Sequence, residues 1–346
     1  MTRAARPWRE AWAAALYGPG GFYARGETPG AHFRTSVHAS PLFAGAILEL
    51  LRRVDRTLGA PDPLDLVDVG AGGGELLAAV LAAADRQLRA RLRVTAVEVG
   101  PVDLPAVRVV RDVTELPALT GLLVANEWLD DVPLDLVEQT ADGPRVVLVS
   151  PAGAESLGGP PAGADLAWLD RWWPLHRVGH RAEVGRSRDE AWAAAVSRLA
   201  RGVAVAVDYA HEAGRRPPEG TLTGYRGGRQ VRPVPDGSCD LTAHVALDAV
   251  AAAGVSAGAT ETRLDDQRAA LQALGVDARR PPQALASTDP PAYLRGLQRA
   301  GEAAELIDRG GLGAFGWLVQ GVGVPLPFPP VATRARVRRK PAPPPG

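Results

Sequence analysis

Short, nearly continuous apolar runs alternate with longer mixed segments through the middle of the chain. The runs that we expect to form strands lie at residues 64–71, 93–100, 107–113, 121–128 and 202–210. Between the first two, residues 75–92 repeat apolar positions at the spacing of one helix. Strands without a polar face are typical of a parallel sheet that helices cover on both sides. The pattern therefore predicts an α/β fold with a mostly parallel sheet.

Helical patterns come before this alternation. Apolar residues recur at helical spacing from Trp8 to Tyr17. A second helix is predicted to follow Ser40 as its N-cap, with Pro41 as its first residue and Gly59 at its end. The first sixty residues are therefore expected to form a helical leader.

Other patterns interrupt or follow the alternation. Two strand-like runs within residues 134–151 flank Asp142-Gly143, which predicts an inserted β-hairpin. A helix is predicted at 241–254, and two further strands at 255–262 and 316–324. We divide the chain into a leader (1–60), an α/β core (61–262) with a hairpin and helices inserted at 131–200, a helical insertion with the final strand (263–330), and a disordered, basic, proline-rich tail (331–346).

Composition excludes several classes of protein. The 346 residues carry 39 Lys and Arg against 39 Asp and Glu, so the net charge does not indicate nucleic-acid binding. Cys239 is the only cysteine, which excludes a disulfide framework and favours a reduced, cytoplasmic setting. No apolar run is long enough to span a membrane. The six histidines lack the spacing of a helical metal site, so we expect no metal.

A glycine-rich loop joins the first predicted strand to the next helix in the sequence DVGAGGGE (68–75). Its glycines permit a tight turn and close approach of a ligand to the backbone. A dinucleotide loop would need glycine at Glu75 or Leu77, and a carboxylate at the helix start would repel a pyrophosphate. The spacing D-x-G-x-G-x-G instead resembles the first motif of class I S-adenosylmethionine (SAM) methyltransferases. SAM carries a sulfonium and an ammonium, which a carboxylate such as Asp68 would stabilise.

Acidic residues also end the next two predicted strands. Glu98 is a candidate to accept both ribose hydroxyls, a role common to NAD-type and SAM-type folds. Asp112 is a candidate for the adenine amino group, or else a loop cap. The expected cofactor contacts around the glycine loop and these strand ends are Asp68, Gly70, Ala71, Gly72, Gly74, Glu98, Val99, Asp112, Val113 and Asn126.

The fourth strand ends in an unusual acidic stretch, ANEWLDD (125–131). Methyl transfer to a cationic nitrogen needs groups that hold the charge of the acceptor and accept its proton. Glu127 is the first candidate, with Asp130 or Asp131 second, although these two aspartates could instead cap a following helix. Asn126 could hold the methionine portion of SAM or the acceptor, and Trp128 could wall the pocket and stack on a cation.

Farther along the chain, GSCDLTAHV (237–245) offers a weaker candidate. Asp240 or Thr242 is expected to be a helix N-cap. His244, with Asp240, is a candidate base if it reaches the pocket.

The ordered set of motifs resembles the MidA-like methyltransferases, which include the mitochondrial complex I assembly arginine methyltransferase. The resemblance covers roughly residues 12 to 325 and is carried by the glycine loop, NEWLDDVP (126–133), VAVDYA (205–210), DLTAHV (240–245) and the leader block YGPGGFYARG…HFRTS…SPLF (17–43). It implies a Rossmann-like class I methyltransferase fold, SAM as the cofactor and a protein arginine as the methyl acceptor. It also implies a protein substrate as the partner, with a respiratory complex subunit as one candidate. Phe33 and Thr35 keep the leader's pattern and are expected to lie against the cofactor.

The leader also departs from the family's pattern. Its usual Gly-Asp is Ala31-His32, and its usual Pro-Glu is Val37-His38. Loss of these carboxylates leaves a second interpretation open, namely a non-catalytic SAM-binding assembly factor that clamps a partner protein. The sequence does not decide the oligomeric state.

Overall fold

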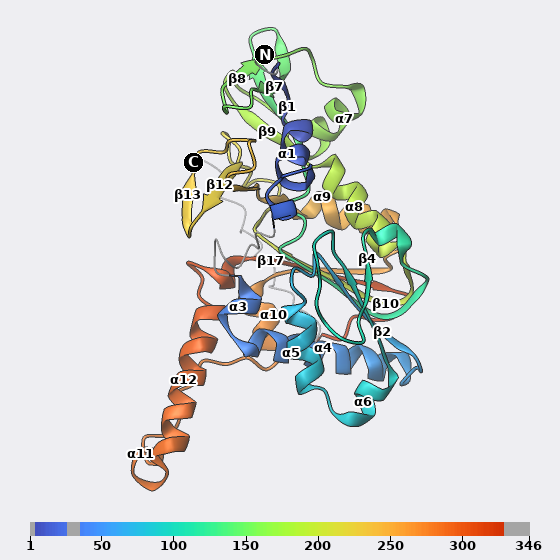
Figure 1. The fold of residues 1–346 in the computed structure, drawn as a ribbon, viewed down its shortest axis with the longest axis vertical. Coiled ribbons are helices and arrows are strands. Elements are labelled where there is room, and N and C mark those ends of the chain that lie inside the picture. Colours follow the sequence, from blue (N-terminus) through green and yellow to red (C-terminus); the bar gives the residue numbers. More distant parts are fainter. Residues whose placement is uncertain (1–3, 26–34, 329–346) are drawn as a thin grey trace, which may run out of the picture.

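The computed structural model describes residues 4–25 and 35–328, and its centre is a seven-stranded sheet (Figure 1). The strand order is β16-β17-β10-β5-β2-β3-β4. Along the chain these strands are β2 (Leu64–Val69), β3 (Leu92–Val97), β4 (Arg108–Val110), β5 (Leu119–Asn126), β10 (Leu199–Asp208), β16 (Glu261–Asp266) and β17 (Gly316–Val322). All five apolar runs of the alternating pattern are therefore strands of one sheet.

The central sheet is mixed. Strands β4, β3, β2, β5 and β10 pair in parallel, whereas β17 is antiparallel to both β10 and β16. Strand β17 lies between β16 and β10, so the antiparallel strand is an interior strand of the sheet and not an edge strand. The expected parallel pairing is confirmed for the five strands from β4 to β10, whereas the pairs that β17 forms with β10 and β16 are antiparallel and correct the prediction.

Helices cover both faces of the central sheet. On one face, α4 (Pro41–Leu58) and α5 (Glu75–Ala83) contribute to a core with β2, β5 and β10. On the other face, α8 (Arg186–Val196) and α9 (Leu247–Ser256) pack over the same strands. The predicted ends of α4 are confirmed: the Ser40 hydroxyl accepts a hydrogen bond from Leu42 N at 3.0 Å, and Gly59 adopts the left-handed conformation.

The single helix expected at 75–92 is two helices. Helix α5 ends at Ala83, and α6 (Arg86–Arg91) begins after Asp85. The Asp85 carboxylate accepts a hydrogen bond from Leu88 N at 2.9 Å, which makes it the N-cap of the new helix.

A second sheet stands above the first in Figure 1. The predicted hairpin is confirmed as β6 (Asp135–Thr140) and β7 (Gly143–Val149), and it pairs with β9 (Arg181–Val184), β8 (Glu155–Leu157) and the short β1 (Arg6–Pro7). Helix α1 (Trp8–Tyr17) buries Trp8, Trp12 and Leu16 against this sheet. Helix α7 (Gly163–Trp172) covers its other side, with Trp168 in the core.

The helix predicted at 241–254 starts later than expected. Residues 240–246 form two short strands, β14 (Asp240–Thr242) and β15 (Val245–Ala246), before α9. Strand β14 pairs with β12 (Thr223–Arg226), which also pairs with β13 (Arg229–Val231), and β15 pairs with β11 (Ala210–His211). Neither Asp240 nor Thr242 is a helix N-cap, because long-range strand pairing overrides the local signal.

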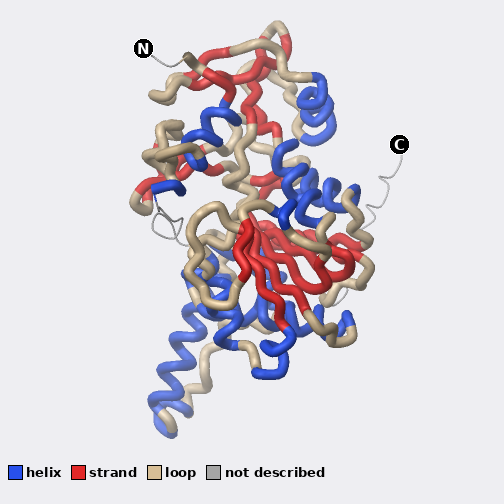
Figure 2. The backbone as a smooth tube through the Cα atoms, turned by 45° about the vertical axis from the view of Figure 1, so that its right-hand side comes forward, coloured by secondary structure: helices blue, strands red, loops and turns tan. Residues whose placement is uncertain are grey.

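The strand predicted at 255–262 is also displaced. Helix α9 continues to Ser256, and β16 starts at Glu261. The expected helical insertion is present as α10 (Gln267–Ala273), α11 (Leu285–Thr288) and α12 (Pro290–Leu306), of which α11 and α12 extend away from the rest of the molecule (Figure 2). The short turns are α3 (Ser36–Ala39), η1 (Tyr23–Arg25), η2 (Val113–Glu115) and η3 (Leu312–Ala314).

In the described part of the chain, no helix combines the length and apolar character needed to cross a bilayer. The predicted tail at 331–346 lies outside the described residues, as does Phe33.

Candidate active site

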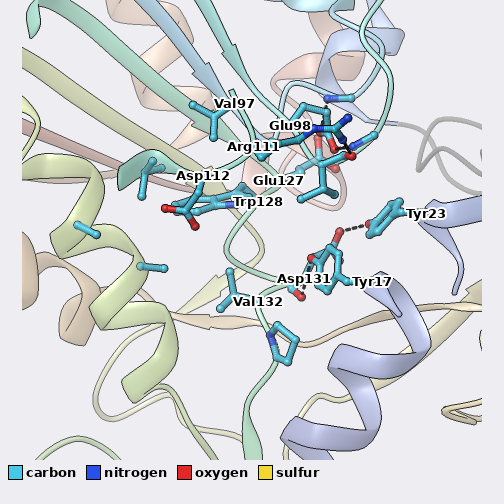
Figure 3. Close-up of a pocket in the computed structure, with 18 of the residues that line it drawn as sticks. Tyr17, Tyr23, Val97, Glu98, Arg111, Asp112, Glu127, Trp128, Asp131 and Val132 are labelled. Carbon is cyan, nitrogen blue, oxygen red and sulfur yellow. Dashed lines mark hydrogen bonds between the residues drawn. The ribbon is translucent and has the colours of Figure 1, made fainter. Parts of the chain in front are cut away.

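The main cavity opens at the carboxyl ends of β2, β3 and β5. Its volume is about 480 Å³, within the range of small-molecule sites. Figure 3 shows Asp112 at one end of the cavity and Tyr17 and Tyr23 at the other, with Glu98, Glu127 and Trp128 between them. A smaller cavity of about 70 Å³ adjoins it across the glycine loop.

The glycine loop adopts a conformation that side chains disfavour. Strand β2 ends at Val69 and α5 begins at Glu75, and between them Gly70, Gly72 and Gly74 have φ values of 72°, 56° and 90°. A Cβ on Gly70 would lie 2.9 Å from the Trp128 ring. The glycines therefore serve both the turn and the close packing of the loop on Trp128.

Glu98 follows β3 and its carboxylate faces the glycine loop. Its Oε2 accepts a hydrogen bond from Gly72 N at 2.9 Å, and its Oε1 accepts one from Gly100 N at 2.8 Å. Val99, beside it, is 46% exposed and lines the same cavity. The two backbone donors fix the carboxylate at the cavity wall.

Asp112 has the capping geometry and also lines the cavity. Its Oδ1 accepts hydrogen bonds from Thr114 N at 2.8 Å and from Thr114 Oγ1 at 2.6 Å, which starts the turn η2. These bonds lower the pKa of the Asp112 carboxyl. Val113 lies next to it on the wall. The loop-cap and cavity-wall interpretations are therefore compatible.

The smaller cavity gathers four predicted residues on the other side of the glycine loop. They are Thr35, Asp68, Ala71 and Asn126. The Asp68 side chain is buried, and burial together with the nearby Glu98 and Glu75 raises its pKa to about 8. Thr35 caps α3 by accepting a hydrogen bond from His38 N at 3.4 Å. A cation in this cavity would stabilise the ionised form of Asp68.

Glu127 combines an unfavourable backbone with an unsatisfied side chain. Its φ of 51° is rare for a residue with a side chain. Its Oε1 accepts hydrogen bonds from Ser36 N at 3.2 Å and Asn126 Nδ2 at 3.0 Å, whereas its Oε2 is buried without a partner. Burial first, and then Asp130, raises the pKa of Glu127 to about 8.

Further carboxyl groups lie behind Glu127. Asp208, at the end of β10, accepts hydrogen bonds from Leu129 N at 3.0 Å and Asp130 N at 3.2 Å. Asp130 accepts a hydrogen bond from the Thr242 hydroxyl at 2.6 Å. The second oxygens of Asp130, Asp131 and Asp208 are buried without a partner. Asp130 and Asp131 do not cap a helix, because β6 follows them.

Burial raises the pKa of each carboxyl group in this cluster. For Asp131 and Asp208 the neighbouring carboxylates add to the effect of burial. For Asp130, burial outweighs the opposing effects of Thr242 and Arg188. A site of this kind favours a bound cation, because a positive charge offsets both the burial and the mutual repulsion.

Comparison with known proteins agrees with this geometry. Residues 42–263, more than half of the chain, match the family described as "Putative S-adenosyl-L-methionine-dependent methyltransferase". The chain belongs to the MidA-like family of these methyltransferases. Its cofactor is S-adenosyl-L-methionine.

Two solved structures from Burkholderia thailandensis resemble the methyltransferase. One is described as a "likely methyl transferase" bound to S-adenosyl-homocysteine, with 25% identity and a TM-score of 0.77. The other, a native structure from the same superfamily, has 27% identity and a TM-score of 0.75. Each alignment covers 93% of this chain and 89% of the other. No curated protein matches the chain.

One predicted site residue, His244, lies outside the cavity. His244 is exposed, stacks on Tyr209 with ring centroids 5.7 Å apart, and is not among the residues that line either cavity. Partial desolvation of the ring, and then the charge of Arg188, lower the pKa of His244. No hydrogen bond joins its side chain to Asp240 within the described residues.

Three residues near the site were not among the candidates named from the sequence. Tyr17 and Tyr23 of the leader line the cavity, and the buried Arg188 of α8 lies behind the acidic cluster. Asp240, which was considered for the site only together with His244, lies against Tyr23. Arg188 sits in a polar-looking helix, and nothing in its spacing marks it as buried. Tyr17 and Tyr23 both belong to the leader block at 17–26, so for these two residues the sequence offered a signal.

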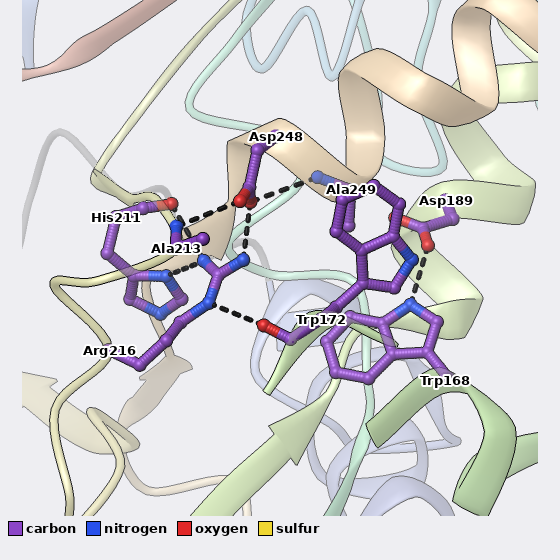
Figure 4. Close-up of polar contacts among 8 residues, drawn as sticks. All are labelled: Trp168, Trp172, Asp189, His211, Ala213, Arg216, Asp248 and Ala249. Carbon is purple, nitrogen blue, oxygen red and sulfur yellow. Dashed lines mark hydrogen bonds and ion pairs between the residues drawn. The ribbon is translucent and has the colours of Figure 1, made fainter. Parts of the chain in front are cut away.

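A second polar cluster lies away from the cavity (Figure 4). The Arg216 guanidinium bonds the His211 ring at 2.6 Å, the Trp172 carbonyl at 3.0 Å and the Asp248 carboxylate. These contacts join the segment after β11 to α7 and α9. Burial and the Arg216 charge lower the pKa of His211 to about 3, so the ring is neutral and the cluster is structural.

Proposed function

We propose that the cofactor lies across the glycine loop, with its nucleoside in the larger cavity. Glu98, fixed by two backbone donors, is placed to accept the ribose hydroxyls. Asp112 and Val113 line the end suited to adenine. The methionine end then reaches the smaller cavity, where Asp68 and the unpartnered Oδ1 of Asn126 can pair with an ammonium.

The acceptor that fits the site best is the guanidinium of a protein arginine. The observation that carries this proposal is the buried Oε2 of Glu127, which has no partner in an otherwise bonded carboxylate. A planar guanidinium supplies donors in a fork that suits such an oxygen. The strained backbone of Glu127 supports a functional role, because a φ of 51° is retained at a cost.

Glu127 can position the acceptor and accept its proton. SAM supplies an electrophilic methyl group on a sulfonium. As the new N–CH₃ bond forms, the S–CH₃ bond breaks, and one proton of the acceptor nitrogen passes to the free Oε2 of Glu127. The raised pKa of Glu127 makes the ionised carboxylate a stronger base than an exposed glutamate. Trp128 and Val132 restrict water on the cavity wall.

Transfer of a radiolabelled methyl group to proteins of a cell lysate tests this proposal. We expect the wild-type chain to label one or more proteins, and Glu127→Gln to reduce labelling at least a hundredfold while S-adenosyl-homocysteine binding changes less than threefold. Labelled product digested to amino acids should contain methylarginine. Cofactor binding without any transfer by the wild-type chain would instead support the non-catalytic assembly factor.

The proposed partner is a protein substrate in the cytoplasm. A link to respiratory complex I assembly rests on the family resemblance alone. Identification of the labelled protein in the same lysate tests that link, and a labelled protein outside the respiratory complex would refute it.

A further inference from the structure

The leader brings two tyrosines to the end of the cavity farthest from Asp112 (Figure 3). The rings of Tyr17, at the end of α1, and Tyr23, in η1, stack with centroids 5.5 Å apart. The Tyr17 hydroxyl donates to the main-chain oxygen of Asp131 at 3.3 Å. Two aromatic faces from the leader therefore border the acidic turn that follows β5.

Tyr23 also joins two carboxyl groups from distant parts of the chain. Its hydroxyl donates a short hydrogen bond to Asp131 Oδ2 and lies 3.5 Å from Asp240 Oδ1. One hydroxyl proton cannot satisfy both carboxylates. Asp131 is 7% exposed and Asp240 is fully buried, and each has a second oxygen without a partner. Among the described residues, no ion pair joins either carboxylate to a basic side chain.

The nearby Arg188 does not form such an ion pair. Its guanidinium donates to the carbonyls of Val132 at 3.1 Å, Ala243 at 2.8 Å and His244 at 3.0 Å, and also to the carbonyl of Asp130. Among the described residues, it makes no hydrogen bond to a carboxylate. Main-chain carbonyls therefore use four of its five N–H donors. Asp131 lines the cavity, and its buried Oδ1 has no partner among the described residues.

From this arrangement we infer that Asp131 and Tyr23 form a second acceptor subsite, which selects a guanidinium over an ammonium. The inference deepens the proposed arginine methylation and rests on it. Asp131 contacts one nitrogen through its free Oδ1 while Glu127 contacts another through its free Oε2. Tyr17 presents its ring to the planar cation. Asp240 is a positioning residue that holds Tyr23.

Two contacts at separate nitrogens explain the selectivity. A guanidinium carries five N–H donors in a rigid plane, so it can bridge Glu127 and Asp131. The compact ammonium of a lysine has no second nitrogen and cannot bridge them in the same way. Each charge-assisted bond that an ammonium fails to form leaves a buried carboxylate oxygen unpaired.

Binding of two small probes to the full chain loaded with S-adenosyl-homocysteine tests the subsite. The probes are Nα-acetyl-L-arginine methylamide and its lysine counterpart, titrated by NMR. We expect the arginine probe to bind at least tenfold more tightly. Tyr23→Phe and Asp131→Asn should each reduce that preference at least fivefold, and Asp240→Asn should reduce it less.

The remote variant Tyr293→Phe serves as the matched control and should keep the full preference. Unchanged S-adenosyl-homocysteine affinity shows that each variant is folded. Equal binding of the two probes, or an unchanged preference in Tyr23→Phe, overturns the inference. If the arginine probe is preferred but no arginine is ever methylated, the methylation proposal fails and the subsite stands.

Discussion

At the scale of single residues, Glu127 combines a strained backbone with a carboxylate whose ionised form is destabilised by burial. The residue sits in the left-handed region, and one of its carboxylate oxygens is buried without a partner. In the unfolded chain a glutamate titrates near 4.5, whereas in the folded protein burial raises the pKa of Glu127 to about 8. The folded state therefore binds more protons between these two values, and its stability falls as pH rises through that window.

The substitution Glu127→Gln should remove this part of the pH dependence. The amide cannot ionise, so we expect it to stabilise the empty protein at pH 8.5 by about 1–3 kcal/mol, allowing for the partial exposure of the residue. At about pH 4, below both pKa values, the group is largely neutral in the folded and in the unfolded protein, and the free energies of unfolding of the two proteins should be nearly equal. Urea unfolding at the two pH values measures this difference. An equal effect of the substitution at both would contradict the assigned pKa.

At the scale of elements, the conformation of the glycine loop between β2 and α5 is fitted to the Trp128 ring that packs against it. Gly70 needs a positive φ, and a Cβ there would lie 2.9 Å from the Trp128 ring. Trp128 follows β5, so two adjacent strand ends are fitted to each other at the floor of the cavity. A change at Gly70 would therefore disturb both the loop and the wall that Trp128 forms.

The substitution Gly70→Ala should weaken cofactor binding at least tenfold, because Trp128 or the loop must move. Isothermal titration with S-adenosyl-homocysteine measures the effect. Gly45→Ala is the matched control, since a Cβ there meets no atom within 4 Å and the site is inside α4. We expect this control to keep the affinity and to gain up to about 1 kcal/mol of stability. Normal affinity in Gly70→Ala would show that the packing is unimportant.

Much of the central architecture follows from local patterns. Apolar runs predicted β2, β3, β4, β5 and β10, because a buried parallel strand needs apolar residues on both faces. Capping residues predicted the ends of α4 for the same local reason. The strands β14 and β15 were missed because their partners, β12 and β11, come from elsewhere in the chain.

The site divides in the same way. The glycine loop, Glu98 and the acidic end of β5 are visible in the sequence because each is a local motif at a strand end. The role of Tyr23 was not visible, and Asp240 was considered only with His244, because the contacts of Tyr23 with Asp131 and Asp240 depend on the tertiary fold. Arg188 was also invisible, since burial of a charged residue depends entirely on the surrounding tertiary structure.

At the scale of the whole molecule, Arg188 connects parts that are distant in sequence. It belongs to α8 and binds carbonyls of the turn after β5 and of the segment between β14 and β15. Its guanidinium carbon also lies 5.7 Å from the centroid of the Trp12 ring in α1. The leader, the central sheet and the inserted sheet therefore meet at one buried cation.

The substitution Arg188→Met should destabilise the protein by about 3 kcal/mol, because it leaves several main-chain carbonyls unpaired in the interior. Chemical unfolding of the two proteins at pH 7 measures the change. The control Arg295→Met, at an exposed position of α12, should change stability by less than about 0.5 kcal/mol. A similar small change for Arg188→Met would show that the buried guanidinium contributes little.

The pairing of β1 with β7 has a consequence for how specificity can change. It joins the leader, whose Tyr17 and Tyr23 line the cavity, to the inserted hairpin, so these two segments form one structural unit. The proposed contacts to the donor nucleoside, Glu98, Asp112 and Val113, lie outside that unit. We expect that exchange of that unit between two relatives transfers the acceptor specificity and leaves the affinity for S-adenosyl-L-methionine unchanged. Substitution of the leader and hairpin alone would then give an enzyme with a new acceptor and an unchanged methyl-donor site.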